Sequence, residues 1–534
     1  MNTALFLMGT VIVICVLTHK FTSHLKVPSL LFFIGLGMCF GENGIFRISF
    51  DDYALSEMIC SACLIFVMFY GGFGTNIKEA KPVAVQSFLL STLGVVLTAG
   101  MVGVFVHIAL GAGWLESMLI GSVVSSTDAA SVFNILRSKK LNLKDNTASL
   151  LELESGSNDP MSYMLTVVMV SLLSGQEISV GMLLLKQIAI GVLCGLVLGK
   201  VTVWLLNNLS IELEQGETIL VFAVATLAYT LPGLLGGNGY LSVYLCGILM
   251  GNSYLPGKRD LVHFFDVVTG VCQMMIFFLL GLLVTPAKLP QVILPQVILP
   301  SLLIMLFMTL VARPISVLGI LLPFKARLGQ IGLVSWAGLR GVASIVFAIF
   351  AVMQGVSAQY NLFNLVFCIV LFSLSVQGAL LPWMSKKMRM IDEKADVLKT
   401  FTDYKEVNDV SFVKISVQED HRWCRKKLWE IALPNDLLVV LIMRGEEKIT
   451  PNGDTQILPG DLLVIAAREF EDRENLTLRE ITVENNDRLK GRTLSEINLT
   501  QKGLIVMIER GKQTIIPNGN TRIEEGDLLV VAKF

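Results

Sequence analysis

Charged residues are scarce along most of this chain. The 534 residues include 42 Lys and Arg and 43 Asp and Glu, which is 16% of the total, whereas a soluble protein has about 25%. The shortage is confined to residues 1–384, which hold only 18 Lys and Arg and 17 Asp and Glu, while residues 385–534 hold the remainder. We therefore expect lipid around the first part of the chain and water around a soluble tail.

The chain also lacks the residue patterns of several functional classes. Its five histidines are scattered, and its nine cysteines lie almost entirely in apolar stretches, so neither a metal centre nor a disulfide framework is predicted. The one CxxC, at Cys60 and Cys63, has no partner ligands nearby. No nucleophile and base are spaced as in an enzyme, and a net charge of −1 offers nucleic acid no basic surface. The sequence argues against an enzyme, a resident cofactor and a nucleic-acid partner.

The first part contains a long series of apolar segments. A transmembrane helix needs about 20 mostly apolar residues, and fewer where it is interrupted inside the protein. The segment at residues 3–19 has no basic flank and no small-residue cleavage site, so it is predicted to be a retained span rather than a signal peptide. The sequence predicts thirteen spans, near residues 3–19, 28–40, 56–73, 84–110, 114–136, 148–174, 179–206, 217–232, 239–252, 264–285, 294–318, 328–353 and 361–383.

The loops between these segments differ in charge. One set of alternate loops has little beyond Arg47 and Lys288, and the loop at 207–217 fits the pattern poorly because it carries three glutamates. Because basic loops stay in the cytoplasm, the N-terminus is predicted outside and the tail inside. The basic set holds Lys20, Lys26, Lys78, Lys81, Arg137, Lys139, Lys140, Lys144, Lys258, Arg259, Lys325, Arg327, Lys386, Lys387 and Arg389.

The tail contains an internal repeat. Residues 449–466, ITPNGDTQILPGDLLVIA, match residues 515–532, IIPNGNTRIEEGDLLVVA, at 12 of 18 positions. Short β-branched runs between PNG and PGD or EGD turns predict strands and hairpins, with a short helix near 421–431 and near 487–497. The tail is therefore predicted to hold two copies of a small α/β module.

Ionisable side chains inside the predicted spans are candidate functional residues, because a charge in lipid is costly. Two of them, Glu152 and Asp266, lie nearer the predicted ends. The clearest are Asp128, Glu154, Asp159 and Arg340.

Asp159 lies in the segment Glu-Ser-Gly-Ser-Asn-Asp-Pro at residues 154–160. On a helix, Ser155 and Asp159 are one turn apart and share a face, and Glu154 and Asn158 share the adjoining face. The glycine and the proline in this segment permit a local departure from regular helix. Two neighbouring faces thus offer a carboxylate with a hydroxyl and a carboxylate with an amide.

Asp128 follows Ser-Ser-Thr inside another apolar segment. If this helix unwinds at Thr127, free carbonyl groups and the end of a helix dipole become available to an ion. A monovalent cation without its water needs several oxygens, which carboxylates, hydroxyls and carbonyls supply. A carboxylate that holds either a cation or a proton is sufficient for their exchange. The alternative is that these acids only hold helices together by hydrogen bonds.

Arg340 lies among small residues in Trp-Ala-Gly-Leu-Arg-Gly, residues 336–341, which allow close helix approach or a break. An arginine keeps its proton in a membrane and needs a carboxylate there. We expect Glu154 to be that partner, in a fixed ion pair that leaves the two aspartates free for ions. Glu152 and Asp266 are the alternative partners.

Three motifs in this order, TDAAS at 127–131, ESGSNDP at 154–160 and WAGLRG at 336–341, resemble the NhaP-type branch of the monovalent cation:proton antiporters. The resemblance covers residues 1–385. It implies an all-α membrane fold of about thirteen transmembrane helices with an NhaA-like inverted repeat and broken crossing helices. It also implies a homodimer in the lipid bilayer, whose core domains move like elevators.

The resemblance implies roles for single residues as well. Asp159 would exchange the cation and the proton, with Asp128, Ser155 and the Thr127 carbonyl as further cation contacts.

The Glu154–Arg340 pair would hold Asn158 in place. Asn158 before Asp159, instead of two successive aspartates, resembles the branch that exchanges one cation for one proton without net charge movement.

The tail repeats resemble the C-terminal ligand-binding module of the potassium-conductance regulators, called RCK_C or TrkA_C. With this match the chain divides into a membrane domain at 1–385, a linker at 386–411, and modules at 412–470 and 478–534. The Rossmann half that often accompanies such modules is absent, because residues 385–411 are too short and lack GxGxxG. NAD binding is therefore not expected.

The combination of an NhaP-like membrane part with these modules resembles bacterial K+/H+ antiporters of the inner membrane. Positive charge around both modules suggests a small anionic effector, a nucleotide such as cyclic di-AMP, although a solvated helix face is the plainer explanation. The basic residues are Lys414, Arg422, Arg425, Lys426, Lys427, Arg488, Lys490 and Arg492.

The leading hypothesis is thus an electroneutral K+/H+ antiporter regulated through its cytoplasmic tail. Na+/H+ exchange at the same site is the nearest alternative, and no single residue decides between K+ and Na+. A ligand-gated potassium channel is a further alternative, because such modules also occur on channels. That reading needs a carbonyl-lined filter such as TVGYG, and the sequence contains none.

Overall fold

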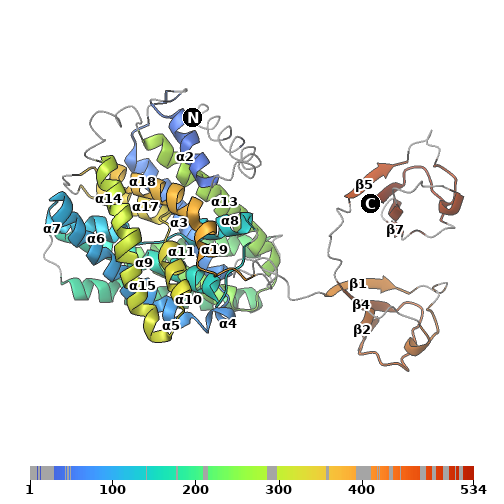
Figure 1. Cartoon of the computed structure of the whole chain (residues 1–534). Coiled ribbons are helices and arrows are strands. Elements are labelled where there is room, and N and C mark those ends of the chain that lie inside the picture. The colour runs from blue at the N-terminus through green and yellow to red at the C-terminus, as the bar shows by residue number, and fades with distance from the viewer. Residues whose placement is uncertain are drawn as a thin grey trace. The chain divides into compact units, whose positions relative to one another are not determined.

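The chain forms two compact units, Met1–Tyr404 and Lys405–Phe534, drawn in Figure 1. The computed structural model describes residues 29–42, 50–139, 141–175, 179–208, 215–284, 297–355, 360–392 and, with short gaps, 410–533, together with a few single positions before residue 50. The first unit is built of helices, and the second contains the strands.

Helices coincide with each apolar segment predicted from residue 28 onward, while the span predicted at 3–19 lies outside the described residues. Within the described part, seven helices are long and apolar enough to cross a membrane, and three shorter ones are also apolar. This unit is therefore a multi-pass, all-α membrane domain. Its main elements are α2 (Ser29–Phe40), α3 (Tyr53–Gly74), α5 (Ala84–Leu89), η1 (Leu90–Gly94), α6 (Val95–Leu110), α7 (Trp114–Val123), α8 (Ala129–Ser138), α9 (Thr147–Leu173), α10 (Val180–Asn208), α11 (Gly216–Leu234), α12 (Gly239–Gly251), α13 (Lys258–Leu283), α14 (Leu299–Phe307), η4 (Met308–Ala312), α15 (Arg313–Leu321), α16 (Leu328–Trp336), α17 (Val342–Met353), α18 (Leu362–Phe372), η6 (Ser373–Gly378) and α19 (Ala379–Lys387).

Two of the apolar segments are interrupted near their middle. Residues 124–128 leave the helix between α7 and α8, so the unwinding at Thr127 on which an ion site would depend does occur. Residues 337–341 do the same between α16 and α17, where small side chains permit it. A backbone hydrogen bond from Asp128 N to Leu339 O, 2.8 Å long, joins the two breaks.

α9 is continuous, although a proline lies inside it. Pro160 removes one backbone donor from the helix, and its carbonyl accepts a 2.9 Å hydrogen bond from the Asn238 side chain of α12. The local departure from helix that the sequence permits is not taken. Asp159 therefore projects from regular helix.

Close helix packing in this unit depends on glycine. A Cβ on Gly281 of α13 would collide with the Ile34 backbone of α2, and a Cβ on Gly72 of α3 would collide with the Tyr244 backbone of α12. Backbones approach this closely only where a side chain is missing. These glycines bring α13 close to α2 and α3 close to α12. α13 also packs on α3, whereas α9 packs mainly on α7, α5 and η1.

Each half of the tail folds into a four-stranded antiparallel sheet. A bulge interrupts the central strand pair at the equivalent place in both sheets. The repeat in the sequence is therefore a repeat of topology. The strand orders are β1 (Val410–Ser416), β4 (Leu462–Arg468), β2 (Leu437–Arg444), β3 (Glu447–Ile449), and β5 (Thr477–Thr482), β8 (Leu528–Lys533), β6 (Leu504–Arg510), β7 (Gln513–Ile515).

The short helices predicted in the tail are wrong over the described residues. Each is reduced to a single 3-10 turn, at Leu428–Glu430 and at Leu494–Glu496. The backbone N–H of Trp429 donates to Gly453 O at 3.0 Å. A donor that a helix would use internally is thus taken by the loop between β3 and β4.

Each module contains a buried aspartate bound by an arginine. Asp461 is 0% exposed, and its two oxygens accept hydrogen bonds from Arg444 Nε at 2.8 Å and Nη2 at 2.9 Å. Asp527 and Arg510 repeat this arrangement at the same distances. Burial alone would raise the pKa of Asp461, but the Arg444 hydrogen bonds hold it below its ordinary value. The Arg510 hydrogen bonds likewise lower the pKa of Asp527.

We expect Asp461→Asn to destabilise the tail, because the amide keeps the shape but loses the charge that Arg444 binds. Hydrogen bonds to charged groups contribute about 1.5–3 kcal/mol, and the lower end applies because Arg444 is partly exposed. Since the folded-state pKa is lowered, this stabilisation is present above the unfolded-state pKa of about 4 and is lost as the pH falls below it.

Urea unfolding of residues 405–534 at pH 7 and at pH 3 measures this effect. The difference between wild type and Asp461→Asn should shrink at pH 3. Asp454→Asn is the matched control, because the Asp454 side chain is 82% exposed and forms a surface ion pair with Lys427. An Asp461→Asn variant as stable as wild type at pH 7 would show that the pair is not a stabilising contact.

Candidate functional site

A cavity of about 250 Å³ lies where the two interrupted helices meet α9. Ser126, Thr127 and Asp128 line it from the break between α7 and α8, and Ser155 and Asp159 line it from α9. The opposite wall comes from α3 and α13. The structure thus brings together the four residues that the sequence predicts as cation and proton contacts.

α9 is joined to the break by two hydroxyl groups. The Ser126 hydroxyl donates a short hydrogen bond to Asp159 Oδ1, and the Ser155 hydroxyl donates to Thr127 O at 2.7 Å. Both contacts form on one side of α9, because Ser155 and Asp159 are one turn apart. Carboxylate, hydroxyl and carbonyl oxygens therefore meet at one place.

Asp128 caps the N-terminus of α8. Its Oδ1 accepts from Ser131 N at 3.1 Å and its Oδ2 from Ser131 Oγ at 2.5 Å. A carboxylate is favoured there because it satisfies a backbone donor and meets the positive end of the helix dipole. A Cβ on Gly341 would collide with this carboxylate, so the approach of α17 requires glycine. Asp128 has a structural role in addition to its place in the cavity wall.

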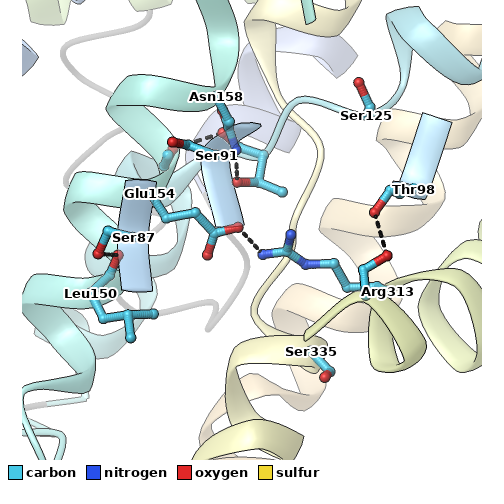
Figure 2. A network of polar contacts seen from close by, with 12 residues as sticks. Ser87, Ser91, Thr98, Ser125, Leu150, Glu154, Asn158, Arg313 and Ser335 are labelled. Carbon is cyan, nitrogen blue, oxygen red and sulfur yellow. Dashed lines mark hydrogen bonds and ion pairs between the residues drawn. The ribbon is translucent and has the colours of Figure 1, made fainter. Parts of the chain in front are cut away.

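The ion pair predicted between Glu154 and Arg340 is wrong. Arg313 of α15 reaches Glu154 instead, and its Nη2 forms a short ion pair with Glu154 Oε1 (Figure 2). The two side chains are only 2% and 1% exposed. Such deep burial of a charge is tolerated because an opposite charge lies in contact with it.

Arg340 is also buried, but its partners are backbone carbonyls. Its Nη1 donates to Ser125 O at 2.8 Å and to Ser126 O at 2.6 Å. These carbonyls follow the C-terminal end of α7, where the helix leaves acceptors unpaired and its dipole favours a positive charge. The expectation that this arginine needs a carboxylate fails because unwound backbone supplies acceptors in its place.

Arg313 is the site residue that the sequence reasoning missed. The available signal was an arginine inside the apolar segment predicted at 294–318. The preceding turn, η4, is π-helical, and the additional residue in such a turn rotates the side chains that follow it. Gly338 leaves the room that Arg313 needs, since a Cβ there would lie 2.9 Å from Arg313 Nε.

Asn158 forms no hydrogen bond with either arginine in the part of the chain that the structure describes. Its Nδ2 donates to Thr127 Oγ1 at 2.5 Å, and the residue is 0% exposed. Asn158 lies on the same helix as Glu154 (Figure 2). The support expected from a Glu154–Arg340 pair is therefore provided by Thr127. The amide ties α9 to the break beside the cavity.

Interrupted helices that bring carboxylates and carbonyls together inside a membrane domain define a transporter of small ions rather than an enzyme. The family model described as sodium/hydrogen exchanger, transmembrane, matches residues 9–387, and the chain belongs to this family. The TrkA-C domain model matches residues 412–469 and 478–532.

Several proteins similar in sequence to this chain are named as cation/proton antiporters. The K(+)/H(+) antiporter NhaP2 of Shewanella oneidensis is 33% identical over 474 residues, which cover 87% of this chain and 81% of that protein. The K(+)/H(+) antiporter NhaP of Alkalimonas amylolytica is 35% identical, covering 71% of this chain and 65% of that protein. The Na(+)/H(+) antiporter ApNhaP of Aphanothece halophytica is 26% identical, covering 70% and 72%.

Among solved structures, the sodium proton antiporter MjNhaP1 from Methanocaldococcus jannaschii has a similar fold. Its TM-score is 0.63 at 20% sequence identity, covering 72% of this chain and 99% of that chain. The membrane domain therefore has an NhaP-like fold.

Because Arg313 and Glu154 form an ion pair, substitutions at these two residues should affect the stability of the protein in a non-additive way. Arg313→Met should lower the melting temperature in detergent strongly, because it leaves the buried Glu154 carboxylate unpaired, a loss of typically about 3–5 kcal/mol. Glu154→Gln in the same protein should recover much of this loss, since a neutral amide no longer needs the arginine.

Arg340→Met is the matched control for this cycle. Its effect on the melting temperature should add to that of Glu154→Gln without recovery, because Arg340 binds carbonyls. Recovery with Arg340→Met and none with Arg313→Met would mean that Arg340 is the functional partner of Glu154 after all.

Proposed function

We propose that this protein is a secondary active antiporter that exchanges a monovalent cation, mainly K+, for a proton. The observation that carries the proposal is Asp159 in one cavity with Asp128, Ser155 and Thr127, at the meeting point of two interrupted helices. Membership of the exchanger family and similarity to proteins named K(+)/H(+) antiporters support it.

Asp159 is the proposed exchange residue. Its carboxylate can hold a proton or balance a cation, but protonation removes the charge that the cation needs. Hydroxyl and carbonyl oxygens of Ser155 and Thr127, with the carboxylate of Asp128, can replace part of the cation's hydration shell. Competition between the two ions at one carboxylate is sufficient for exchange.

The proposed exchange is electroneutral. One carboxylate that carries a proton in one direction and a monovalent cation in the other moves no net charge. Asn158 supports this stoichiometry, because a neutral amide bound to Thr127 Oγ1 stands where a second carboxylate would add a charge.

The proposed architecture is a homodimer of thirteen-span protomers with an inverted repeat and elevator-like cores. The order of elements supports the repeat: η1 precedes the interrupted pair α7 and α8, and η4 precedes the interrupted pair α16 and α17. The proposed chain division is a membrane domain at 1–385, a linker at 386–411, and modules at 412–470 and 478–534.

We place the N-terminus outside and the tail in the cytoplasm, with the protein in the bacterial inner membrane. The basic loop before α9 and the basic end of α19 lie together, since Lys144 Nζ donates to Arg389 O at 3.5 Å. Two basic stretches on one side of the membrane domain agree with the positive-inside rule.

The preference for K+ rests on the similar proteins rather than on a residue. The two relatives with the higher identity are named for K(+) and the more distant one for Na(+). Na+/H+ exchange at the same site is the second candidate.

Asp159→Asn should abolish exchange while the protein still inserts into membranes, because the amide is nearly isosteric but holds neither a proton nor a charge. Proton flux in proteoliposomes, driven in turn by K+, Na+ and Li+, measures both the loss and the cation preference. Asp145→Asn, a change at a loop carboxylate that pairs with Arg327, should leave the flux unchanged. Normal flux in Asp159→Asn would contradict the assignment, and flux with Na+ alone would favour the second candidate.

We further propose that a small anionic ligand, a nucleotide such as cyclic di-AMP, binds the tail and regulates exchange. The match to TrkA-C modules supports ligand binding. The side chains of Lys414, Arg422 and Arg488 lie outside the described residues. Exposed basic residues near the 3-10 turns of the two modules are Arg425, Lys426, Lys427, Lys490 and Arg492.

Truncation after Tyr404 should leave an active antiporter that no longer responds to such a ligand, because the membrane unit contains the whole proposed exchange site. A cut at this point also keeps the bridge between Ile391 and Leu143. Flux of full-length and truncated protein in matched vesicles, with and without cyclic di-AMP, measures the response. A truncated protein that inserts but does not exchange would show that the tail is structural.

A further inference from the structure

The cavity has a second wall, across from α9, that the proposed exchange reaction does not use. Asp266, Thr269 and Gln273 of α13 and Tyr70 of α3 line it. Intervals of three and four residues place the three α13 side chains on one face of that helix. A polar stripe thus runs along an otherwise apolar transmembrane helix, and polar groups there mark ion pathways.

Thr269 has a buried hydroxyl that finds no hydrogen-bond partner among the residues that the structure describes. The residue is 8% exposed, lines the cavity, and its Oγ1 accepts and donates no hydrogen bond within the described residues. A threonine in a helix commonly bonds to the carbonyl one turn earlier, as Thr166 and Thr202 do at 2.8 and 2.7 Å. Because an unsatisfied buried oxygen costs free energy, this hydroxyl indicates a ligand position.

Asp266 lies one turn before Thr269 and adds a negative charge. Tyr70 Oη donates to Asp266 Oδ1 at 3.3 Å, which orients the carboxylate. The side chain is exposed at the edge of the cavity and forms no ion pair with the described lysines and arginines. Gly270 lines the same cavity, and a Cβ added there would meet nothing within 4 Å, so α13 faces open space at this turn.

We propose that Asp266 and Thr269 form a second cation-binding position, an outer station that holds K+ or Na+ before the ion reaches Asp159. A partly dehydrated monovalent cation requires a carboxylate and further oxygens, which Asp266, Thr269 and the Gln273 amide supply. This inference rests on the proposed antiport. Asp266 lies on α13, which packs on α2 and α3, whereas Asp159 lies on α9, which packs on α7, α5 and η1. In this proposal Asp266 raises the local concentration of the cation, and Asp159 remains the group that exchanges it for a proton.

The station serves one side of the membrane. Asp266 is eight residues, about 12 Å, from the start of α13, whereas Asp159 is twelve residues, about 18 Å, from the start of α9. Both helices begin next to basic residues, at Lys258 and near Lys144. Asp266 is therefore nearer the basic, tail-side surface, and its charge acts on cations that enter from there.

The test is the cation dependence of proton flux in full-length protein, with K+ titrated separately on each side of oriented proteoliposomes. Asp266→Asn should raise the KM for K+ on the tail side about three- to tenfold, more than it lowers the maximal rate, because a unit charge near the ion path is removed. Thr269→Val should shift KM in the same direction, and Thr269→Ser should restore it. The KM on the opposite side should stay unchanged.

Asp260→Asn is the matched control, because it removes the same charge from an exposed position on the first turn of α13. Its KM should equal that of wild type. A second readout needs no transport: the KCl concentration that half-maximally raises the melting temperature in detergent should increase in Asp266→Asn and not in Asp260→Asn.

The outcomes separate this inference from the proposed function. Normal exchange by wild type with an unchanged tail-side KM in Asp266→Asn overturns the station and leaves the antiport intact. A lower maximal rate with an unchanged KM also overturns it. If wild type exchanges none of K+, Na+ and Li+, the antiport proposal fails, and the KCl-dependent melting shift alone decides whether the station binds a cation.

Discussion

Carbonyl groups that leave a helix inside a membrane must find new hydrogen-bond donors, and the cavity depends on how this is achieved. The guanidinium of Arg340 binds Ser125 O and Ser126 O, and the Ser155 hydroxyl binds Thr127 O. These donors come from the second interrupted segment and from α9. The break between α7 and α8 is therefore stable only when both neighbours are in place, and the same assembly creates the ion site.

The charged side chains beside the break between α7 and α8 fall into two groups. Glu154 is in contact with Arg313, and Arg340 is bound to carbonyls, so these charges are compensated within the protein. The donor that the structure shows for Asp159 is a hydroxyl, that of Ser126. A carboxylate bound by an arginine has no need of another cation, whereas one bound by a hydroxyl can still accept a proton or a metal ion. This difference is why Asp159, and not Glu154, is suited to exchange.

The two modules of the tail are stabilised by the same set of contacts. In both modules an arginine on a strand binds an aspartate that is 0% exposed. The loop that ends at this aspartate also accepts hydrogen bonds from backbone N–H groups of the 3-10 turn. Each module therefore has a stable framework of its own. A ligand can influence the membrane domain only if it binds one arrangement of the tail more tightly than another, and that requirement is what the truncation experiment examines.

Local features of the chain were predictable because hydrophobicity, turn residues and helical spacing act over a few residues. They determined the membrane class, the strands of the tail and the shared face of Ser155 and Asp159. Which groups Arg313 and Arg340 bind was decided only by the tertiary structure. Arg313, directly after the π-helical turn η4, pairs with Glu154, and Arg340 binds the unwound carbonyls that follow α7. Likewise, α13 lines the cavity across from α9, and a close glycine contact holds α13 against α2. Each of these depends on distances between elements that are far apart in the chain, which no local pattern encodes.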